Sequence, residues 1–390
     1  MSLKKVAIDL RSLDSATGKR GIGYYTFNLM EKVLSLPHPD IGFILYTTLG
    51  SRTSNRLKID VQDRFYRIPT LLHPVRGLRR LDPIFSSFWQ RALDKSRPDL
   101  VHIIYLFDLF YTAVLDQPAT VVTVYDLTPL IFKEHFFSKQ KAFDWYLQKA
   151  GQLKKAKRII AISQSAKRDL VTLLRIPEDK ISVVYGSISS HFRPVKNARA
   201  IVAKRYGIKR PFLLSVGAFS YHKNIPRLFE AFASYLALKK NRLDLVVVCK
   251  LTGREEAKWR DLLGRLNISE YVHLTNFVAD SDLPTFYSAS DALIFPSLYE
   301  GFGLPILEAM ACGTPVITSN TSSMPEAGGD AALYVNPEKT EEITAAIDKL
   351  LGDQALKDKL VEKGFKQVRR FSWQKAAEET LEIYREVLKS

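Results

Sequence analysis

The stretch Pro296-Ser297-Leu298-Tyr299-Glu300-Gly301-Phe302-Gly303-Leu304-Pro305-Ile306-Leu307-Glu308-Ala309-Met310 is the most informative part of this chain. It follows a short apolar run, 291–295, of the kind that forms a buried strand. Residues 304–312 have the pattern of a helix that ends at Gly313, and 315–318 has the pattern of another strand. The order strand, Gly-rich loop, helix, strand predicts a parallel α/β sheet.

Two carboxylates, Glu300 and Glu308, lie on either side of the start of the predicted helix. Unpaired N–H groups at a helix N-terminus bind phosphate well. An ionised Glu only accepts hydrogen bonds and can take two from a vicinal diol. A diphosphate flanked by sugar hydroxyls is a nucleotide-sugar, which is therefore the predicted ligand. The alternative is an ordinary βαβ unit whose glycines make turns and whose glutamates are solvated.

Residues 296–317 resemble the Glu-x7-Glu signature of family 4 of the retaining glycosyltransferases. The resemblance runs without a gap, so it is more specific than a lone glycine motif. It implies an α/β fold of the GT-B type, with two Rossmann-like domains facing each other across a cleft and a C-terminal helix that crosses back to the first domain. It also implies transfer of a hexose from a GDP- or UDP-sugar with retention at the anomeric carbon and without a metal cofactor.

The resemblance gives roles to particular residues of the stretch. Glu308 matches the acid that grips the nucleotide ribose, and Glu300 matches the catalytic acid that contacts the donor sugar. The backbone between them is expected to meet the diphosphate or the sugar, at Gly301, Phe302, Gly303 and Leu304.

A second set of candidate residues is Gly217, His222, Lys223 and Asn224, which follow one predicted strand and precede a helix. The family usually has Arg-Lys-Asn here, with the cations neutralising the donor diphosphate. Lys223 keeps that charge and is a predicted catalytic residue, but His222 is mostly neutral at pH 7 and lacks the two-pronged guanidinium of Arg. The alternative for Lys223 is an exposed lysine at a helix start.

A glycine-rich loop, Gly18-Lys19-Arg20-Gly21-Ile22-Gly23, joins the first predicted strand to the first predicted helix. The resemblance implies that Gly21 and Gly23 let substrate approach the backbone, which glycine permits because it has no Cβ. Taken without the resemblance, the two glycines are equally well explained by a simple turn.

Tyr125-Asp126 follows the predicted strand 120–124, where family members usually have His-Asp with the His close to the reacting sugar. A phenol hydrogen-bonds a sugar hydroxyl but titrates near pH 10, so Tyr125 is not a base at neutral pH. Three readings stay open: the His role is dispensable, Tyr125 and Asp126 share it, or the activity differs from the family norm. Both residues are candidate catalytic residues.

The chain has 390 residues, which fits two domains. Segment 187–210 has no strong apolar period, so the boundary is expected near 195. The predicted organisation is an acceptor-binding domain 1–194, a nucleotide-sugar-binding domain 195–371, and a C-terminal helix 372–390 on the first domain. The predicted strands are 6–10, 43–46, 100–104, 120–124, 159–162, 181–184, 212–216, 243–248, 272–274, 292–295, 316–318 and 332–335.

The net charge of +16 is concentrated in the first half. Residues 1–195 hold 30 Lys+Arg and 17 Asp+Glu (30 − 17 = +13), while the rest contributes +3. The mixture of cations and bulky apolar residues in 76–89 is typical of segments that meet an anionic membrane surface. A solvated basic face is the alternative. Nucleic acid is not expected, because no nucleic-acid-binding motif accompanies the charge.

Other features narrow the class of protein. Cys249 and Cys312 are predicted to be small buried hydrophobic residues, since two cysteines exclude a disulfide framework or a Cys-based metal site. No apolar run is long enough to span a membrane, and 1–6 lacks the apolar core of a signal peptide. No Asp-x-Asp follows a strand in a donor-site context, so no metal is expected. The protein is expected in the cytoplasm, peripheral at the inner face of the cell membrane.

The sequence therefore predicts a retaining, metal-independent glycosyltransferase of cell-surface or extracellular polysaccharide biosynthesis. Its acceptor is expected to be a glycan, including one carried on a polyprenyl diphosphate. Two alternatives remain: a nucleotide-sugar epimerase of the same fold, and a non-catalytic member that binds sugar nucleotides.

Overall fold

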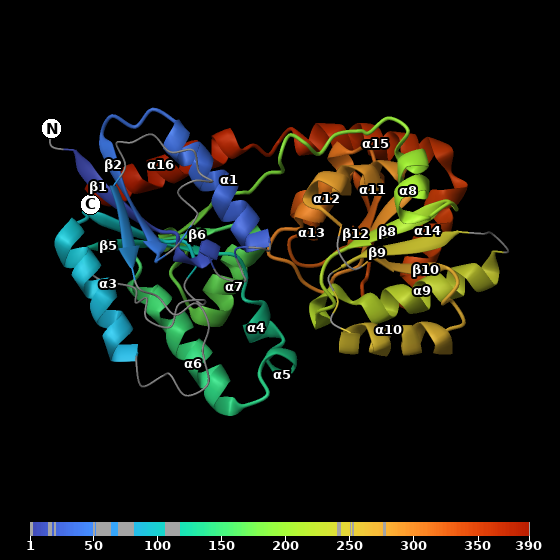
Figure 1. Cartoon of the computed structure of the whole chain (residues 1–390), viewed down its shortest axis with the longest axis horizontal. Helices are drawn as coiled ribbons and strands as arrows, with labels where there is room; N and C mark the ends of the chain where they lie inside the picture. Colours follow the sequence, from blue (N-terminus) through green and yellow to red (C-terminus); the bar gives the residue numbers. More distant parts are fainter. Residues whose placement is uncertain are drawn as a thin grey trace. The chain divides into compact units, whose positions relative to one another are not determined.

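The computed structural model describes residues 3–14, 18, 21–49, 51, 64–68, 82–105, 118–239, 243–249, 251, 253–275 and 278–389. The chain forms two compact units. The first unit comprises Met1–Gly186 together with Ser372–Ser390, and the second comprises Ser187–Phe371. Each has its own parallel sheet, as Figure 1 shows, and its own cluster of buried apolar residues.

The sheet of the first unit has the strand order β3-β2-β1-β4-β5-β6-β7, and every neighbouring pair is parallel. The order reverses between β1 and β4, which is the doubly wound arrangement. The strands are β1 (Lys4–Asp9), β2 (Ile41–Thr48), β3 (Arg64–Ile68), β4 (Leu100–Ile103), β5 (Ala119–Val124), β6 (Arg158–Ala161) and β7 (Ile181–Val183).

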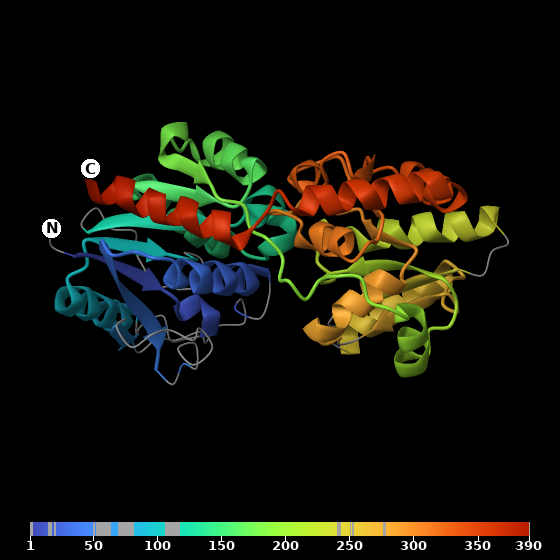
Figure 2. The same ribbon diagram turned by 90° about the horizontal axis from the view of Figure 1, so that it is seen from above.

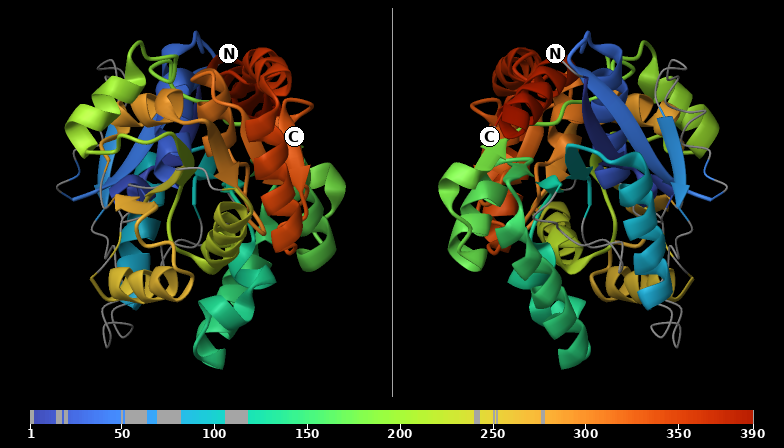
Figure 3. Two further views of the ribbon diagram at one scale, coloured as in Figure 1. Left: turned by 90° about the vertical axis from the view of Figure 1, so that its right-hand side faces the viewer. Right: turned by 90° about the vertical axis from the view of Figure 1, so that its left-hand side faces the viewer.

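Helices cover both faces of this sheet. On one face α16 (Trp373–Lys389) runs beside α1 (Gly21–Ser35), as Figures 1 and 2 show. On the other, apolar residues of α3 (Asp82–Ser96) and α7 (Gln164–Leu174) join the core. Figure 3 shows α16 and α3 on opposite sides of the strands. Three shorter helices follow β5: α4 (Thr128–Ile131), α5 (Lys133–Phe136) and α6 (Gln140–Gly151).

The sheet of the second unit has the order β10-β9-β8-β11-β12-β13, again all parallel, and reverses between β8 and β11. The strands are β8 (Phe212–Val216), β9 (Asp244–Val248), β10 (Val272–Thr275), β11 (Ala292–Phe295), β12 (Val316–Ser319) and β13 (Ala332–Val335). The helices are α8 (Ala198–Tyr206), α9 (Ile225–Leu238), α10 (Gly253–Arg265), α11 (Leu283–Ala289), α12 (Leu304–Ala311), α13 (Met324–Gly328), α14 (Thr340–Gly352) and α15 (Gln354–Val368).

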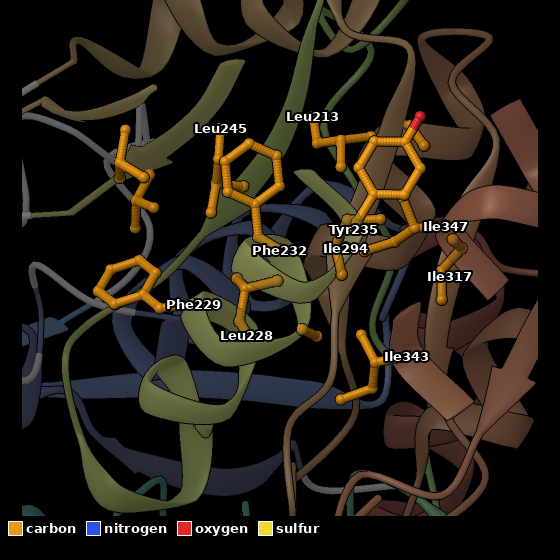
Figure 4. Packing of buried hydrophobic residues seen from close by; sticks show 14 of the residues in the cluster. Leu213, Leu228, Phe229, Phe232, Tyr235, Leu245, Ile294, Ile317, Ile343 and Ile347 are labelled. Atoms are coloured by element: carbon orange, nitrogen blue, oxygen red, sulfur yellow. The ribbon is translucent and has the colours of Figure 1, made fainter. Parts of the chain in front are cut away.

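The core of the second unit forms where α9 and α14 pack on the strands. Figure 4 shows Phe229, Phe232 and Tyr235 of α9 against Leu213 and Leu245 of the sheet. Strands with buried residues on both faces require near-continuous apolar sequence. That requirement explains why the predicted strands could be recognised as apolar runs.

The α/β fold class and the predicted strands are confirmed, with ends that differ by one or two residues. Strand β3 was not predicted. Helix α8 was not predicted either, because only Ala198 and Val202 of that helix are buried and so little apolar period exists. The segment 187–210 packs on the second unit, where the Val195 N–H donates to Ser288 Oγ at 3.0 Å. The units therefore divide at Gly186–Ser187, earlier than the predicted boundary near 195.

The predicted membrane-contacting segment 76–89 is corrected in part. Residues 76–81 lie outside the described residues, and 82–89 belongs to α3. Trp89 is only 3% exposed. The Arg11 guanidinium carbon lies 4.4 Å from the centre of its ring, and Tyr46 packs edge-on against the same ring. Trp89 is thus a core residue of the first unit. Among the helices that the structure describes, none is long and apolar enough to cross a membrane.

A buried polar chain attaches the C-terminal helix to the first unit. His102 of β4 is fully buried, with Nε2 hydrogen-bonded to Thr123 Oγ1 at 2.8 Å and Nδ1 to Tyr384 OH of α16 at 2.6 Å. At the rim, Arg385 donates to both oxygens of Asp40. The predicted packing of the C-terminal helix on the first domain is what the structure has. Burial lowers the pKa of His102 to about 3, so the imidazole is neutral in the folded protein.

The stability of the protein is expected to fall in acid through His102. Its folded-state pKa is about 3, against 6.5 ordinarily, so below pH 6.5 the unfolded chain binds a proton that the folded chain excludes. This group therefore lowers the free energy of unfolding by about 1.4 kcal/mol per pH unit between pH 6 and 4. Denaturant titrations of the wild type and of His102→Gln at several pH values measure the contribution. Equal pH slopes for the two proteins would refute it.

Candidate functional site

The loops after β8 and β11 carry the two sequence motifs. They meet above the carboxyl ends of these strands, at the place where the strand order of the second unit reverses, which is its switch point. Lys223 follows β8 and Glu300 follows β11. Lys223 Nζ donates to Glu300 Oε1 at 2.7 Å, and the two side chains are 16% and 12% exposed. In open α/β sheets this crevice is where ligands bind. The sequence placed both residues at a sheet edge, and the structure joins them as an ion pair.

The backbone of Glu300 is fixed by two serines of the loop after β12. Ser322 Oγ donates to the Glu300 carbonyl at 2.7 Å, and Ser323 Oγ donates to the same oxygen at 2.8 Å. The Glu300 N–H in turn donates to Ser322 Oγ at 3.2 Å. These serines position the carboxylate, a role for which the sequence motif gives no signal.

The Lys223 side chain lies along Gly217. Gly217 has φ +150°, and a Cβ there would lie 3.5 Å from Lys223 Cε. The ammonium lies 5.0 Å from the centre of the Phe295 ring, a cation–π contact. The neighbouring His222 is partly buried, and its carbonyl accepts from Leu298 N at 2.7 Å. Glycine suits this position because of its backbone conformation, since a Cβ would only be in ordinary van der Waals contact with the lysine. The peptide of His222 ties the two loops together.

Asn224 has a structural role in this arrangement. It adopts the left-handed conformation, with φ +58°, and is 6% exposed. Its amide nitrogen donates to the carbonyls of Pro296 and Pro337, at 3.0 and 2.6 Å. The amide oxygen accepts from Arg227. In the structure the Asn224 amide fastens loops of the protein, and its contact with the donor stays a prediction.

The residues of the glycine-rich turn before α12 differ in their exposure. Phe302 is 4% exposed, and its ring packs edge-on against Phe371 with centroids 5.3 Å apart, so its side chain belongs to the interior. Gly303 has φ +101° and precedes the first residue of α12, Leu304, while Gly301 and Leu304 are partly exposed. Only glycine adopts this φ without strain. Gly301 and Leu304 are therefore the partly exposed positions of this turn, whereas Phe302 and Gly303 are buried.

Glu308, one turn into α12, has a different environment from Glu300. It is partly accessible, and its Oε2 accepts a hydrogen bond from Tyr287 OH at 2.7 Å. Burial raises the pKa of Glu308 to about 7, with a further rise from Asp280, opposed by the Tyr287 hydrogen bond and by Lys223. Near neutral pH this carboxyl is therefore divided between its ionised and protonated forms.

In the first unit, Tyr125 is directed into the interior. It is 3% exposed, its hydroxyl is hydrogen-bonded to Thr26 Oγ1 at 2.6 Å, and Tyr25 and Tyr105 pack edge-on around its ring. Burial raises the pKa of the phenol, which stays neutral. The structure thus uses Tyr125 to link the end of β5 to α1. Its contact with a sugar stays a prediction.

Asp126 is the polar group that this strand end presents. It is partly exposed, and its Oδ1 accepts from Thr128 N at 2.9 Å, which forms a local turn just before α4. The described residues give its Oδ2 no hydrogen-bond donor. Of the predicted pair, Asp126 is thus the more exposed residue.

The two predicted glycines of the first unit do different things. A Cβ on Gly23 would lie 2.1 Å from the Gly18 carbonyl oxygen, so close backbone packing requires glycine there. A Cβ on Gly21 would meet no atom of the described residues within 4 Å. Residues 19 and 20, which precede Gly21, lie outside the described residues. Among the described atoms, Gly23 is therefore closely packed and Gly21 is not.

A buried ion pair at the end of β1 was missed by the sequence analysis. Arg11 donates through Nε and Nη2 to the two oxygens of Asp9, both at 2.7 Å, and both side chains are 1% exposed. The sequence contains a signal for this pair, because Asp9 ends an apolar run and Arg11 follows two positions later. The pair lies at the end of β1, beside the reversal of strand order in the first unit.

Within the described part of the chain, no three His, Cys, Asp or Glu side chains gather closely enough to hold a metal ion.

Comparison with protein families agrees with this geometry. Residues 21–191 match the model of Glycosyltransferase Family 4, and residues 199–367 match the model of Glycosyl transferases group 1. The chain belongs to glycosyltransferase family 4. The Glu300–Glu308 stretch lies inside the second match, and Tyr125–Asp126 lies inside the first.

Known relatives include bacterial mannosyltransferases. The serotype-specific mannosyltransferase WbdA of Escherichia coli is 29% identical over 310 residues, which is 77% of this chain and 38% of that protein. The O-antigen chain mannosyltransferase B of Escherichia coli is 31% identical over 244 residues, 62% of this chain and 64% of that one. The matches thus span well under half of WbdA and just under two thirds of the second relative.

Solved structures share the fold over the whole chain. The sucrose-phosphate synthase of Thermosynechococcus elongatus superposes with a TM-score of 0.76 over 99% of both chains, at 20% identity. The predicted GT-B fold type is therefore confirmed.

The glycines of the first unit give a paired test of stability. Gly23→Ala is expected to lower the free energy of unfolding by about 1–3 kcal/mol, because the new methyl group displaces the Gly18 backbone. Gly21→Ala adds its methyl group in open space and is expected to change stability by less than about 0.5 kcal/mol. Denaturant unfolding of both variants measures the difference. Similar losses in the two variants would contradict the assignment.

Proposed function

We propose that the protein is a retaining glycosyltransferase that moves a hexose from a GDP- or UDP-sugar to a hydroxyl of a growing glycan in polysaccharide biosynthesis. The observation that carries the proposal is the Lys223–Glu300 ion pair at the switch point of the second unit, close to Glu308 and the Gly301–Leu304 backbone. The names of the relatives favour mannose as the sugar. The second unit is accordingly assigned the nucleotide-sugar.

The proposed roles follow from charge and hydrogen bonding. Lys223 turns from Glu300 to the donor diphosphate and stabilises the departing nucleoside diphosphate, together with N–H groups at the start of α12. Glu300, held by its two serines, accepts hydrogen bonds from the donor sugar and orients it. Glu308 accepts from the ribose hydroxyls.

In the proposed reaction, the bond between the anomeric carbon and the diphosphate oxygen breaks, and the acceptor oxygen bonds to that carbon on the same face. The acceptor proton goes to the leaving phosphate oxygen, so no dedicated base is needed. Positive charge from Lys223 replaces the metal ion that other transferases use, and we propose that no metal cofactor is required.

The first unit is assigned the acceptor. Asp126 is the carboxylate that would accept a hydrogen bond from the acceptor hydroxyl, and Gly21, which has no neighbour within 4 Å of an added Cβ among the described residues, would let the acceptor approach the backbone. Tyr125 would act only by fixing the strand end. The basic charge of residues 1–195 suits an acceptor on a polyprenyl diphosphate at an anionic membrane surface, and we propose that the protein works at the inner face of the cell membrane.

Donor binding and turnover separate the roles of the two glutamates. A thermal-shift screen with GDP-, UDP- and ADP-sugars is expected to show stabilisation by one nucleotide class, which is lost in Glu308→Ala. Glu300→Gln keeps the shape of the side chain and is expected to bind the nucleotide but to turn over about 100-fold more slowly, because it no longer orients the sugar as a carboxylate does.

Product analysis with a glycan acceptor distinguishes the outcomes. A new glycosidic bond with retained configuration supports the proposal. Flat thermal-shift curves for every nucleotide would remove the nucleotide-sugar assignment. Conversion of the donor without an acceptor would indicate an epimerase, and binding without any product would indicate a non-catalytic sugar-nucleotide-binding protein.

A further inference from the structure

Tyr287 of α11 is a fully buried tyrosine whose hydroxyl group reaches the site. Its exposed fraction is 0%, and its OH donates to Glu308 Oε2 at 2.7 Å. The Tyr287 carbonyl accepts from Thr314 Oγ1 at 2.6 Å and from Ser290 Oγ at 2.8 Å. Phe192 packs edge-on against the ring. Ring and backbone are thus held from several sides, and the phenol is a rigid donor.

This donor leaves the two oxygens of Glu308 unequal. Oε2 is engaged by Tyr287, while Oε1 accepts no hydrogen bond from the residues that the structure describes. The side chain stays partly accessible. A carboxylate fixed through one oxygen presents the other in a defined direction, which lowers the entropy lost when a ligand hydroxyl binds to it.

We propose that Tyr287 is a positioning residue for the nucleotide: it holds Oε2 of Glu308 so that Oε1 faces a ribose hydroxyl, and it favours the ionised carboxylate that accepts from that hydroxyl. The inference rests on the proposed function, because it takes Glu308 as the ribose-binding residue. Tyr287 itself does not touch the ligand.

The charged and titratable groups around Glu308 come from several elements. Asp280 precedes α11 and disfavours the ionised carboxylate, while Lys223 follows β8 and favours it. Burial raises the pKa of Cys312, at the end of α12, so its thiol is neutral. Asp280 Oδ2 also lies 3.3 Å from His191 Nε2. Tyr287 is the neutral group among them that stabilises the negative charge by direct hydrogen bonding.

The proposal predicts that nucleotide binding depends on pH, because it depends on the ionisation of Glu308. The pKa of Glu308 is about 7, and the Tyr287 hydrogen bond lowers it from the higher value that burial alone would give. A ribose hydroxyl donates best to the ionised form, so nucleotide binding is expected to weaken as the pH falls through about 7. Without the phenol hydroxyl the pKa rises, and the same weakening moves to higher pH.

Tyr287→Phe tests the proposal, since it removes only the hydroxyl group. The dissociation constants of GDP and UDP are measured by calorimetry from pH 6 to 9, and donor KM and kcat are measured over the same range. For the nucleotide that binds, the variant is expected to show about tenfold weaker binding at pH 7, with a midpoint displaced to higher pH and partial recovery at pH 8.5. The effect is expected in KM, with kcat little changed.

Two further variants separate the possible outcomes. Tyr235→Phe in α9 removes the hydroxyl of another buried tyrosine, 3% exposed, and is expected to leave binding and its pH profile unchanged. Glu308→Gln cannot ionise and is expected to bind weakly with a flat pH profile. If Glu308→Gln binds like the wild type, or the wild type binds neither nucleotide, the proposed function fails.

Other results bear on Tyr287 alone. If Glu308→Gln loses binding while Tyr287→Phe has the wild-type profile at every pH, the positioning role is overturned and the proposed function stands. An equal loss of binding at all pH values, with a lowered melting temperature, would overturn it as well, because a purely structural role predicts no displaced midpoint.

Discussion

The reversal of strand order between β8 and β11 is the constraint on which the site of the second unit depends. All strands of the sheet are parallel, so their carboxyl ends lie at one edge, and at the reversal the following connections diverge to opposite faces. The loops after β8 and β11 therefore border a space that no crossover helix fills. Lys223 and Glu300 enter it from the two sides and form their 2.7 Å ion pair there. The serines of the loop after β12 then fix the backbone that carries the glutamate.

Two glutamates of one short stretch are given different chemistry by their partners. Glu300 is paired with a cation, which suits the charged carboxylate that the proposed function requires. Glu308 is paired with a neutral phenol and loses hydration by burial, which brings its pKa close to neutrality. Two acids that look alike in the motif thus differ in their environment, because Lys223 pairs with one and Tyr287 with the other.

The first unit uses its polar residues in a different way. His102, Thr123 and Tyr384 form a buried chain that attaches α16, and Asp9 and Arg11 satisfy each other inside the fold. Burial of such groups is costly unless each is hydrogen-bonded, and here each has its partner. Asp126 remains as the accessible carboxylate at the end of β5, while the adjacent Tyr125 is taken into the interior.

By itself the sequence determined the α/β class, the position of most strands and the stretch around Glu300, because doubly buried strands require apolar runs and the turn before α12 requires glycine. It left β3 and α8 unrecognised, since α8 buries only two residues and its period is weak. Only the tertiary structure decided that Asn224 fastens loops, that Phe302 and Trp89 are interior residues, and that Tyr287 meets Glu308. These outcomes depend on contacts between residues 21 to 113 positions apart, or on the direction of a side chain, and neither is contained in local spacing.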